Sequence, residues 1–145
     1  MRLASFTDYG LRVLMRLADT PDEAVSTGQL ADEFKISQHH LAKVVQDLGR
    51  GGFILTQRGK GGGLRLARAA QTITLGEVVR HLEQRFALVD CFRADGGTCV
   101  LQPRCRLKNQ LAAAREAFIN ELNRTTIEEC KWPADGTHAA PNAAA

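Results

Sequence analysis

Four of the six residues from 58 to 63 are glycines, and this run constrains the fold more than any other segment of the chain. The segments on either side, residues 53–57 and 64–67, favour two short strands, so the sequence predicts a hairpin. Glycines permit positive φ and leave the loop almost without side chains, so its tip can enter a narrow groove. Arg58 and Lys60 place positive charge at that tip. A phosphate-binding loop is disfavoured because strands flank the glycines on both sides and no Gly-Lys-Ser/Thr sequence follows.

Three helical patterns precede this hairpin. Thr7 or Asp8 is expected to cap the first helix. Ser26 and Gln29 have the spacing of a capping box at the start of a second, short helix. Ser37 is expected to cap a third helix, whose apolar residues recur on one helical face: Leu41, Val44, Val45 and Leu48. Because a short helix, a turn and an amphipathic helix form a helix-turn-helix, the adjoining hairpin predicts a winged helix-turn-helix.

The positive charge of the chain is concentrated in this first half. Residues 1–75 carry ten Lys or Arg against seven Asp or Glu, a balance of +3, whereas the remainder is neutral. Residues 43–68 contain six Lys or Arg and a single acidic residue, Asp47, which gives this stretch a net charge of +5. A patch this local indicates a polyanion bound at one surface, and a solvated charged face is the alternative. The sequence has no apolar run of the ~20 residues that span a bilayer and no secretory signal, so we expect a cytoplasmic protein.

Double-stranded DNA is the polyanion that a winged helix-turn-helix predicts. We expect the contacts to come from the start of the third helix and from the wing: Ser37, Gln38, His39, His40, Lys43, Arg58 and Lys60. Gln38 can pair bidentately with adenine, and cations on the wing suit the minor groove of A·T-rich DNA. His39 and His40 have a second interpretation as plain surface residues.

A further helix and a long amphipathic run follow the hairpin. Thr74 and Glu77 have the spacing of another capping box. Beyond them, apolar residues recur every three or four positions, as in a helix that packs on a partner: Leu107, Leu111, Ala114, Phe118 and Leu122. We therefore expect a dimer seam along this helix, and packing within its own chain is the alternative. Thr126 and Glu129 are expected to cap a last short helix.

The sequence thus predicts a mainly α fold with a small β-wing, in which a winged helix-turn-helix domain is joined to a long C-terminal dimerisation helix. Residues 1–72 are expected to bind DNA, and residues 73–131 to form the cysteine-bearing loop and the dimerisation helices. Residues 132–145 lack periodicity and are expected to be a disordered tail. We expect no enzyme and no catalytic residue, because the sequence offers no nucleophile–base arrangement.

Three of the four cysteines, Cys91, Cys99 and Cys105, lie within fifteen residues. A cytosolic chain is not expected to carry structural disulfides, so this cluster indicates metal binding or redox activity. Structural zinc normally uses paired cysteine knuckles and a fourth ligand, for which His81 is the one nearby His. An iron–sulfur cubane needs one protein ligand per iron, so three cysteines leave one corner for another donor. The spacing favours an iron–sulfur cluster, with zinc and unliganded thiols as alternatives.

Several short segments together form a highly specific signature of one protein family, although no single segment would identify it. They are Met-Arg-Leu at 1–3, Phe-Thr-Asp-Tyr at 6–9, the glycine-rich wing at 58–66, Ile-Thr-Leu-Gly-Glu-Val-Val at 73–79, the three cysteines, and Cys-Arg-Leu at 105–107. On these segments, over about residues 1–130, the chain resembles the Rrf-type iron–sulfur winged-helix repressors. The resemblance implies a homodimer that represses transcription from a palindromic operator.

Within that family the chain looks most like the nitric-oxide-sensing NsrR branch, because of Thr-Asp-Tyr at 7–9 and Val-Asp-Cys at 89–91. In that branch the resemblance implies a 4Fe–4S cluster bound by Cys91, Cys99 and Cys105, with a 2Fe–2S cluster as the alternative. Its fourth ligand would be Asp8 of the other subunit, and nitric oxide would be the signal. A helix cap is the alternative role of Asp8.

Two further interpretations stay open. The seven-residue gap between Cys91 and Cys99 also occurs in the RirA-like branch, which favours iron or cluster status as the signal. The IscR-like branch carries a His three residues after the last cysteine, where this chain has Lys108, which argues against that branch. Outside the family, a small iron–sulfur or redox carrier protein is the alternative, but it leaves the basic patch without a purpose.

Overall fold

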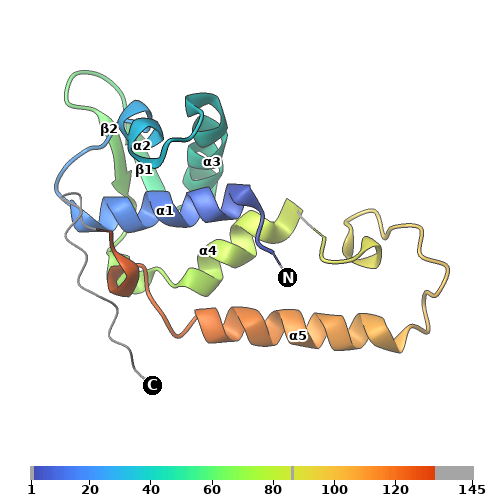
Figure 1. Ribbon diagram of the computed structural model, residues 1–145. Coiled ribbons are helices and arrows are strands. Elements are labelled where there is room, and N and C mark those ends of the chain that lie inside the picture. The colour runs from blue at the N-terminus through green and yellow to red at the C-terminus, as the bar shows by residue number, and fades with distance from the viewer. Residues whose placement is uncertain (1, 86, 133–145) are drawn as a thin grey trace.

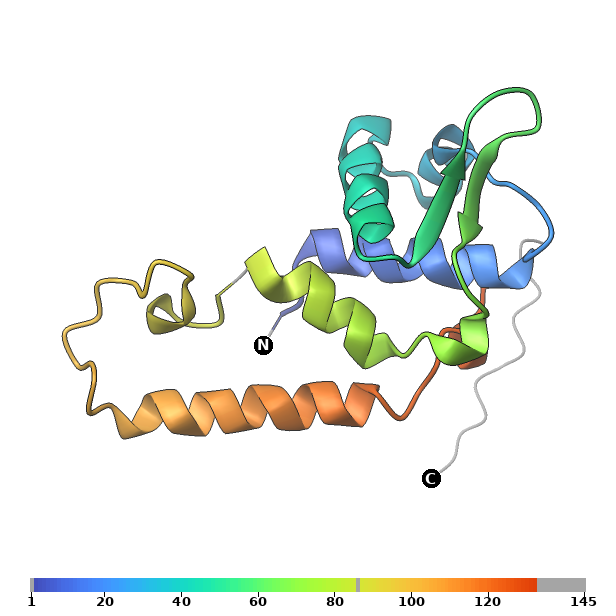
Figure 2. The same cartoon turned by 180° about the vertical axis from the view of Figure 1, so that it is seen from behind.

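A computed structural model describes residues 2–85 and 87–132 of the chain. Helix α1 (Ser5–Asp19) runs through the middle of the molecule, between two tiers of elements (Figures 1 and 2). The first tier contains α2 (Thr27–Phe34), α3 (Gln38–Arg50), and a hairpin of β1 (Ile54–Gln57) and β2 (Gly63–Leu66). The second contains α4 (Leu75–Leu82) and α5 (Arg106–Leu122). Four 3-10 turns join them: η1 (Ala70–Thr72), η2 (Glu83–Arg85), η3 (Asp90–Phe92) and η4 (Glu128–Cys130).

Local hydrogen bonds explain why α2 and α3 form a helix-turn-helix. At the start of α2 the Ser26 hydroxyl accepts from the Gln29 amide at 3.1 Å, and the Gln29 side chain accepts from the Ser26 amide at 2.9 Å. This confirms the expected capping box. Lys35 then turns the chain with a φ of 55°. Ser37 precedes α3 as predicted, although its side chain makes no capping hydrogen bond.

The predicted cap of α1 is wrong, because the helix begins earlier. Its first residue is Ser5, and the Ala4 carbonyl accepts from the amides of Thr7 and Asp8 at 3.0 and 3.1 Å. These two amides therefore lie inside the helix and need no side-chain cap. The Thr7 side chain is fully buried, and its hydroxyl has no hydrogen-bond partner among the described residues.

The core of the molecule surrounds α1 and joins both tiers. Val13, Leu14 and Leu17 are buried on α1, where they belong to one cluster with Leu41 and Leu48 of α3. The same cluster includes buried residues from the loops and from the second tier: Val25, Phe53, Ile73, Val78, Leu82 and Ile127. Fully burying an aliphatic side chain stabilises a fold by about 1.5–3 kcal/mol, so this cluster holds α3 firmly against α1.

The wing is a two-stranded antiparallel sheet in which Ile54 pairs with Leu66 and Gln57 with Gly63. This confirms the predicted hairpin, with each strand shifted by one residue at its boundary. A third segment adds to it, because Val25 and Leu64 exchange backbone hydrogen bonds of 3.1 and 2.8 Å. Gly63 has a φ of 150°, and a Cβ atom there would lie 2.9 Å from the Val25 carbonyl oxygen. A glycine is therefore required where the wing meets this segment.

The second tier is held by polar contacts and a few apolar ones. The expected capping box at α4 is present, with the Glu77 amide 3.2 Å from the Thr74 hydroxyl. The last helix is a single 3-10 turn, η4, whose N-cap residue is Ile127 rather than the expected Thr126. Thr126 and Glu129 still form the expected reciprocal pair, because the Thr126 amide donates to the Glu129 carboxylate at 2.6 Å and the Glu129 amide to the Thr126 hydroxyl at 3.4 Å. Trp132 donates its backbone N–H to the Met15 carbonyl at 3.0 Å. The rest of the predicted tail, residues 133–145, lies outside the described residues.

Candidate functional site

The first residues of α3 form an exposed polar surface. The apolar face of this helix is buried against the core, with Leu41 and Leu48 at 0% exposure. The opposite face points to solvent and carries four of the predicted DNA contacts: Gln38, His39, His40 and Lys43. Ser37, directly before the helix, is exposed as well. An amphipathic helix anchored in this way presents its polar side chains as a rigid unit.

The wing loop projects from the same end of the molecule as the start of α3 (Figures 1 and 2). Arg58 and Lys60 are exposed on it. Among the described residues neither they nor Lys43 form an ion pair, whereas Arg68 pairs with Glu77 at 2.9 Å. Arg65 also has a partner, the Asp22 carbonyl at 2.5 Å. The structure therefore places three uncompensated cations at one end of the molecule.

The three clustered cysteines lie on one irregular segment between α4 and α5, residues 87–105, which we call the cysteine segment. Cys91 lies in η3, Cys99 in the following loop, and Cys105 immediately before α5. All three are free thiols of intermediate exposure. Within the described part of the chain, no three His, Cys, Asp or Glu side chains gather closely enough to hold a metal ion. Three thiols on one segment nevertheless fit a thiophilic metal or an iron–sulfur cluster by their chemistry.

Short-range polar contacts organise this segment. The Asp90 carboxylate accepts from the Thr98 amide at 2.7 Å, and Arg93 pairs with Asp95 at 2.6 Å. The guanidinium of Arg93 lowers the pKa of Asp95, which keeps the carboxylate charged. Among the large apolar side chains here, Val100 is 92% and Leu101 is 64% exposed. The segment is thus held by its own turns rather than by a core.

Asp8, the proposed fourth ligand, lies in the first turn of α1. Its carboxylate is 2.7 Å from the guanidinium of Arg12, one turn further along the same helix, and about half of its side chain is exposed. No sequence motif assigns a role to Arg12. The i,i+4 spacing of an acid and a base on a helix is the signal that identifies this pair.

Cys130, the fourth cysteine, lies apart from this set, in η4. Burial raises the pKa of its thiol, and the nearby Glu129 adds to the effect. A raised pKa keeps the group as a neutral thiol near neutral pH, whereas metal ligands are thiolates. The structure therefore gives no support for Cys130 as a ligand.

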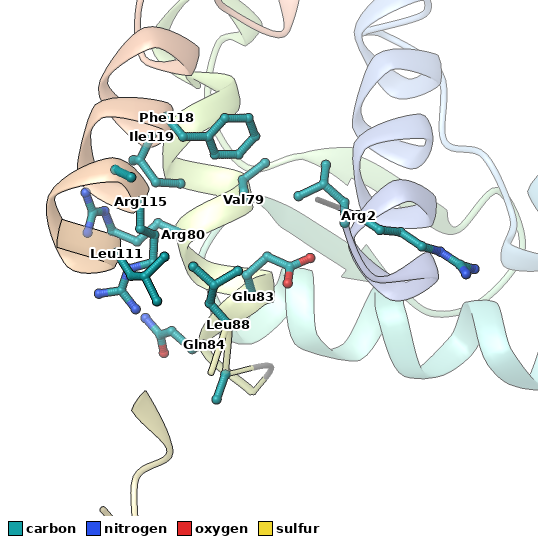
Figure 3. Close-up of a pocket in the computed structure, with 13 residues that line it drawn as sticks. Arg2, Val79, Arg80, Glu83, Gln84, Leu88, Leu111, Arg115, Phe118 and Ile119 are labelled. Atoms are coloured by element: carbon teal, nitrogen blue, oxygen red, sulfur yellow. The ribbon is translucent and has the colours of Figure 1, made fainter. Parts of the chain in front are cut away.

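A cavity of about 740 Å³ opens between α4, α5 and the N-terminal residues (Figure 3). Val79 of α4 and Leu111 and Phe118 of α5 line it with apolar surface. Glu83 lies at its edge, where its carboxylate accepts from the Ala4 amide at 2.9 Å. Along α5, Ile119 is buried while Leu107 is 60% exposed. Much of the apolar surface of α5 is therefore uncovered in a single chain.

His81 is a residue whose position the sequence did not indicate. The sequence suggested it only as a zinc ligand, but its ring lies against the end of α3, with Nε2 3.0 Å from the Asp47 carbonyl oxygen. Among the described residues it belongs to no metal-binding group. No local pattern signals this contact, because 34 residues separate the two partners.

The match to a known family agrees with this geometry. The sequence profile of Rrf2, described as an iron-dependent transcriptional regulator, matches residues 3–130. The chain belongs to the Rrf2 family. This confirms the family resemblance predicted from the sequence, and members of this family regulate transcription.

Curated relatives match nearly the same length of the chain as the family profile. The HTH-type transcriptional regulator NsrR of Bacillus licheniformis is 42% identical over 130 residues, which cover 89% of this chain and 91% of the relative. The NsrR of Geobacillus kaustophilus is 45% identical over 130 residues, covering 89% and 88%. At this similarity, the chain is an NsrR-type member of the Rrf2 family.

Solved structures of other regulators share the fold. The global cysteine regulator CymR of B. subtilis superposes with a TM-score of 0.69 at 27% identity, covering 89% of this chain and 95% of CymR. IscR of T. potens gives 0.68 at 21% identity, covering 89% and 85%, which shows a common fold. The predicted mainly α fold with a small β-wing is thereby confirmed.

Proposed function

We propose that this Rrf2-family chain is a homodimeric, cytoplasmic repressor that binds a palindromic DNA operator and loses affinity for it in response to nitric oxide. One observation carries the DNA-binding part: the exposed polar start of α3 and the cationic wing tip project from the same end of the molecule (Figure 1). The NsrR-named relatives support the choice of signal. Residues 1–72 would form the DNA-binding domain and residues 73–131 the sensing and dimerisation region.

Base recognition is assigned to the start of α3. Gln38 would donate and accept bidentately at an adenine, while His39, His40 and Ser37 reach neighbouring base edges or phosphates. Lys43, Arg58 and Lys60 neutralise phosphates, because they form no ion pair within the described residues that DNA would have to break. The buried side chains of Leu41 and Leu48 attach the opposite face of α3 to the core.

Dimerisation is assigned to α5. Leu107 is exposed, Leu111 and Phe118 are only partly buried, and the cavity beside them is apolar, so a second copy of the helix has a surface to cover. A dimer must hold its two reading helices about 34–36 Å apart to contact both half-sites. A small change at the α5 seam would therefore alter the spacing of the two reading helices and weaken their contacts with both half-sites of the operator.

The sensing site is assigned to Cys91, Cys99 and Cys105, with Asp8 of the partner subunit as the fourth ligand of a 4Fe–4S cluster. When bound there, the cluster would supply iron to which nitric oxide can bind, and Asp8 would be the most readily displaced ligand, because a carboxylate oxygen is a harder and weaker donor than a thiolate. Within its own chain Arg12 holds the Asp8 carboxylate at 2.7 Å. Arg12 would therefore compete with an iron ion for the Asp8 carboxylate.

A second candidate signal is iron or cluster supply, as in the RirA-like and IscR-like branches. The observation that favours it is the seven-residue gap between Cys91 and Cys99. The DNA-binding residues and the dimer seam are the same in both proposals. The two proposals differ only in the signal at the cysteine segment, which is nitric oxide in one and the supply of iron or cluster in the other.

The decisive experiment is oxygen-free purification followed by an absorbance spectrum and a nitric oxide titration, with binding to promoter DNA followed in parallel. We expect a brown protein whose affinity for DNA falls as nitric oxide is added. A colourless preparation that contains zinc, or equal binding by the loaded and stripped forms, would contradict the proposal. A loaded protein that responds to iron chelation but not to nitric oxide would favour the second signal.

Asp8→Ala tests the fourth ligand. We expect the three cysteines still to permit cluster assembly, while the nitric oxide titration changes in shape and stoichiometry. Arg12→Ala is the matched control, because it removes the ion-pair partner of Asp8 but keeps the carboxylate, so the stoichiometry of the titration should stay that of wild type. An unchanged titration of the Asp8 variant would count against this assignment.

A further inference from the structure

A polar contact joins α4 to the last turn of α3, on the side away from the DNA-reading residues. The His81 Nε2 atom lies 3.0 Å from the Asp47 carbonyl oxygen and 3.9 Å from a carboxylate oxygen of the same residue. A carbonyl oxygen only accepts hydrogen bonds, so Nε2 must carry the proton. The Asp47 side chain is 8% exposed and that of His81 is 26% exposed, so the contact is largely sheltered from water.

This contact caps α3 from a different helix. The Asp47 carbonyl is among the last carbonyls of α3 (Gln38–Arg50) and also accepts from the Gly51 amide at 2.9 Å. His81 takes the second lone pair. A histidine N–H near a helix C-terminus can donate to one of the last carbonyls of that helix. Here that cap is supplied by α4, so the two helices are joined at one defined point.

The surroundings of His81 fix its ring. The ring of Phe53 packs edge-on against it, with centroids 5.5 Å apart. A Cβ atom at Gly51 would lie 2.8 Å from His81 Nε2 and 2.7 Å from the Phe53 ring, so only glycine leaves room for both. One turn earlier on α4, Glu77 pairs with Arg68, whose guanidinium lies over the Phe53 ring. One face of α4 therefore contacts both the C-terminal end of α3 and the Phe53 and Arg68 side chains beside it.

We propose that His81 is a positioning residue that sets the angle of the reading helix α3 relative to α4. The proposal rests on the proposed DNA-binding function and deepens it. Helix α4 ends at Leu82, and Cys91 follows His81 by ten residues. The cysteine segment therefore begins just beyond the helix that holds α3. A displacement of the end of α4 moves His81, and with it the C-terminal end of α3.

The test compares two substitutions at this position. His81→Phe keeps an aromatic ring beside Phe53 and removes the N–H donor, whereas His81→Gln keeps a donor. The probe is a fluorescent duplex selected by the wild-type protein from a random library, with an unselected duplex of equal length as reference. We expect His81→Phe to bind the selected duplex about tenfold more weakly and the reference within about twofold of wild type, with most affinity restored in His81→Gln.

The control is Arg80→Gln, on the adjacent residue of α4. Arg80 pairs with Glu116 of α5 at 2.6 Å, so the substitution breaks a contact of α4 that does not involve α3. We expect its affinity for the selected duplex to stay within about twofold of wild type. A loss equal to that of His81→Phe would assign the effect to α4 as a whole and overturn the proposal.

Hydrogen exchange supplies a readout that is independent of DNA and of any cluster. In His81→Phe the amides at the end of α3, that of Gly51 above all, should exchange several-fold faster, while those of α2 stay unchanged. Gly51→Ala makes the same test if His81→Phe does not fold, because the added methyl group displaces the His81 ring. If wild type selects no duplex, the proposed function fails. If wild type selects one and His81→Phe binds it equally well, only this inference fails.

Discussion

The winged helix and the cysteine segment with α5 are held together in different ways. Around α1 and α3 the side chains of Leu14, Leu41 and Leu48 are fully buried, so this region forms its own core. On α5 a single residue, Ile119, is buried, and η3 contains none. The cysteine segment relies on turns such as that between Asp90 and Thr98. One region is complete in a single chain, whereas the other presents surfaces that a partner or a ligand would cover.

The largest effect is expected in the core of the winged helix. Leu48→Ala leaves a cavity between α1 and α3, and we expect it to lower the free energy of unfolding by about 2–5 kcal/mol. Leu101→Ala in the cysteine segment is the matched control, because Leu101 is 64% exposed, and its effect should stay within about 0.5 kcal/mol. Urea unfolding measures both. Similar losses for the two variants would break the comparison.

The next effect concerns association. Leu107→Asp places a charge on the exposed apolar surface of α5 and should weaken dimerisation by at least about tenfold, as measured by sedimentation. The winged helix should remain folded, because Leu107 does not belong to the core cluster. Lys108→Asp is the matched control, because it places the same carboxylate at the next position of α5, where the native side chain is already charged, and it should leave dimerisation largely unchanged. A dimer that withstands Leu107→Asp would place the seam elsewhere.

A smaller effect is expected at the wing. Lys60→Ala removes one phosphate contact, so binding should weaken similarly at all DNA sequences, and the slope of log K against log salt should fall by about one. Glu121→Ala, an exposed position on α5, serves as the control. A loss confined to some sequences would show instead that Lys60 reads bases.

The smallest effect concerns the junction between the two regions. Burial acts to raise the pKa of Glu77, but hydrogen bonds from Thr74 and Arg68 outweigh it, so the pKa lies below its ordinary value of 4.5. A lowered pKa in the folded state gives stability that is present above 4.5 and is lost as the pH falls through the folded value.

Glu77→Gln should therefore cost less than about 1 kcal/mol at neutral pH, and the cost should shrink progressively as the pH falls below 4.5, by urea unfolding across this range. Glu116→Gln is the control within the second tier, because Glu116 pairs with Arg80 and does not reach the winged helix. A cost that persists in acid would show that the charge of Glu77 does not contribute.

The parts of the fold that the sequence predicted are those encoded within a few residues. The capping boxes at Ser26 and Thr74, the buried face of α3 and the wing hairpin follow from spacings of two to four residues. Helix α1 was misplaced at its start, because Ala4, which carries no capping side chain, supplies the carbonyl that the first turn uses. For the site, the exposure of Ser37 to His40 and of Lys43 follows from amphipathicity, whereas their contacts with DNA and the roles of the cysteines and of Asp8 stay predictions.

The sequence by itself determined the helices, the wing, the position of the basic residues and the family, because periodicity, caps and motifs are local properties of a chain. Only the tertiary structure decided that His81 caps α3, that Val25 joins the wing and that Glu83 holds the start of α1. These partners are separated by 34, 39 and 79 residues respectively. Contacts over such distances depend on how the elements pack around the buried core, since no spacing along the chain encodes them.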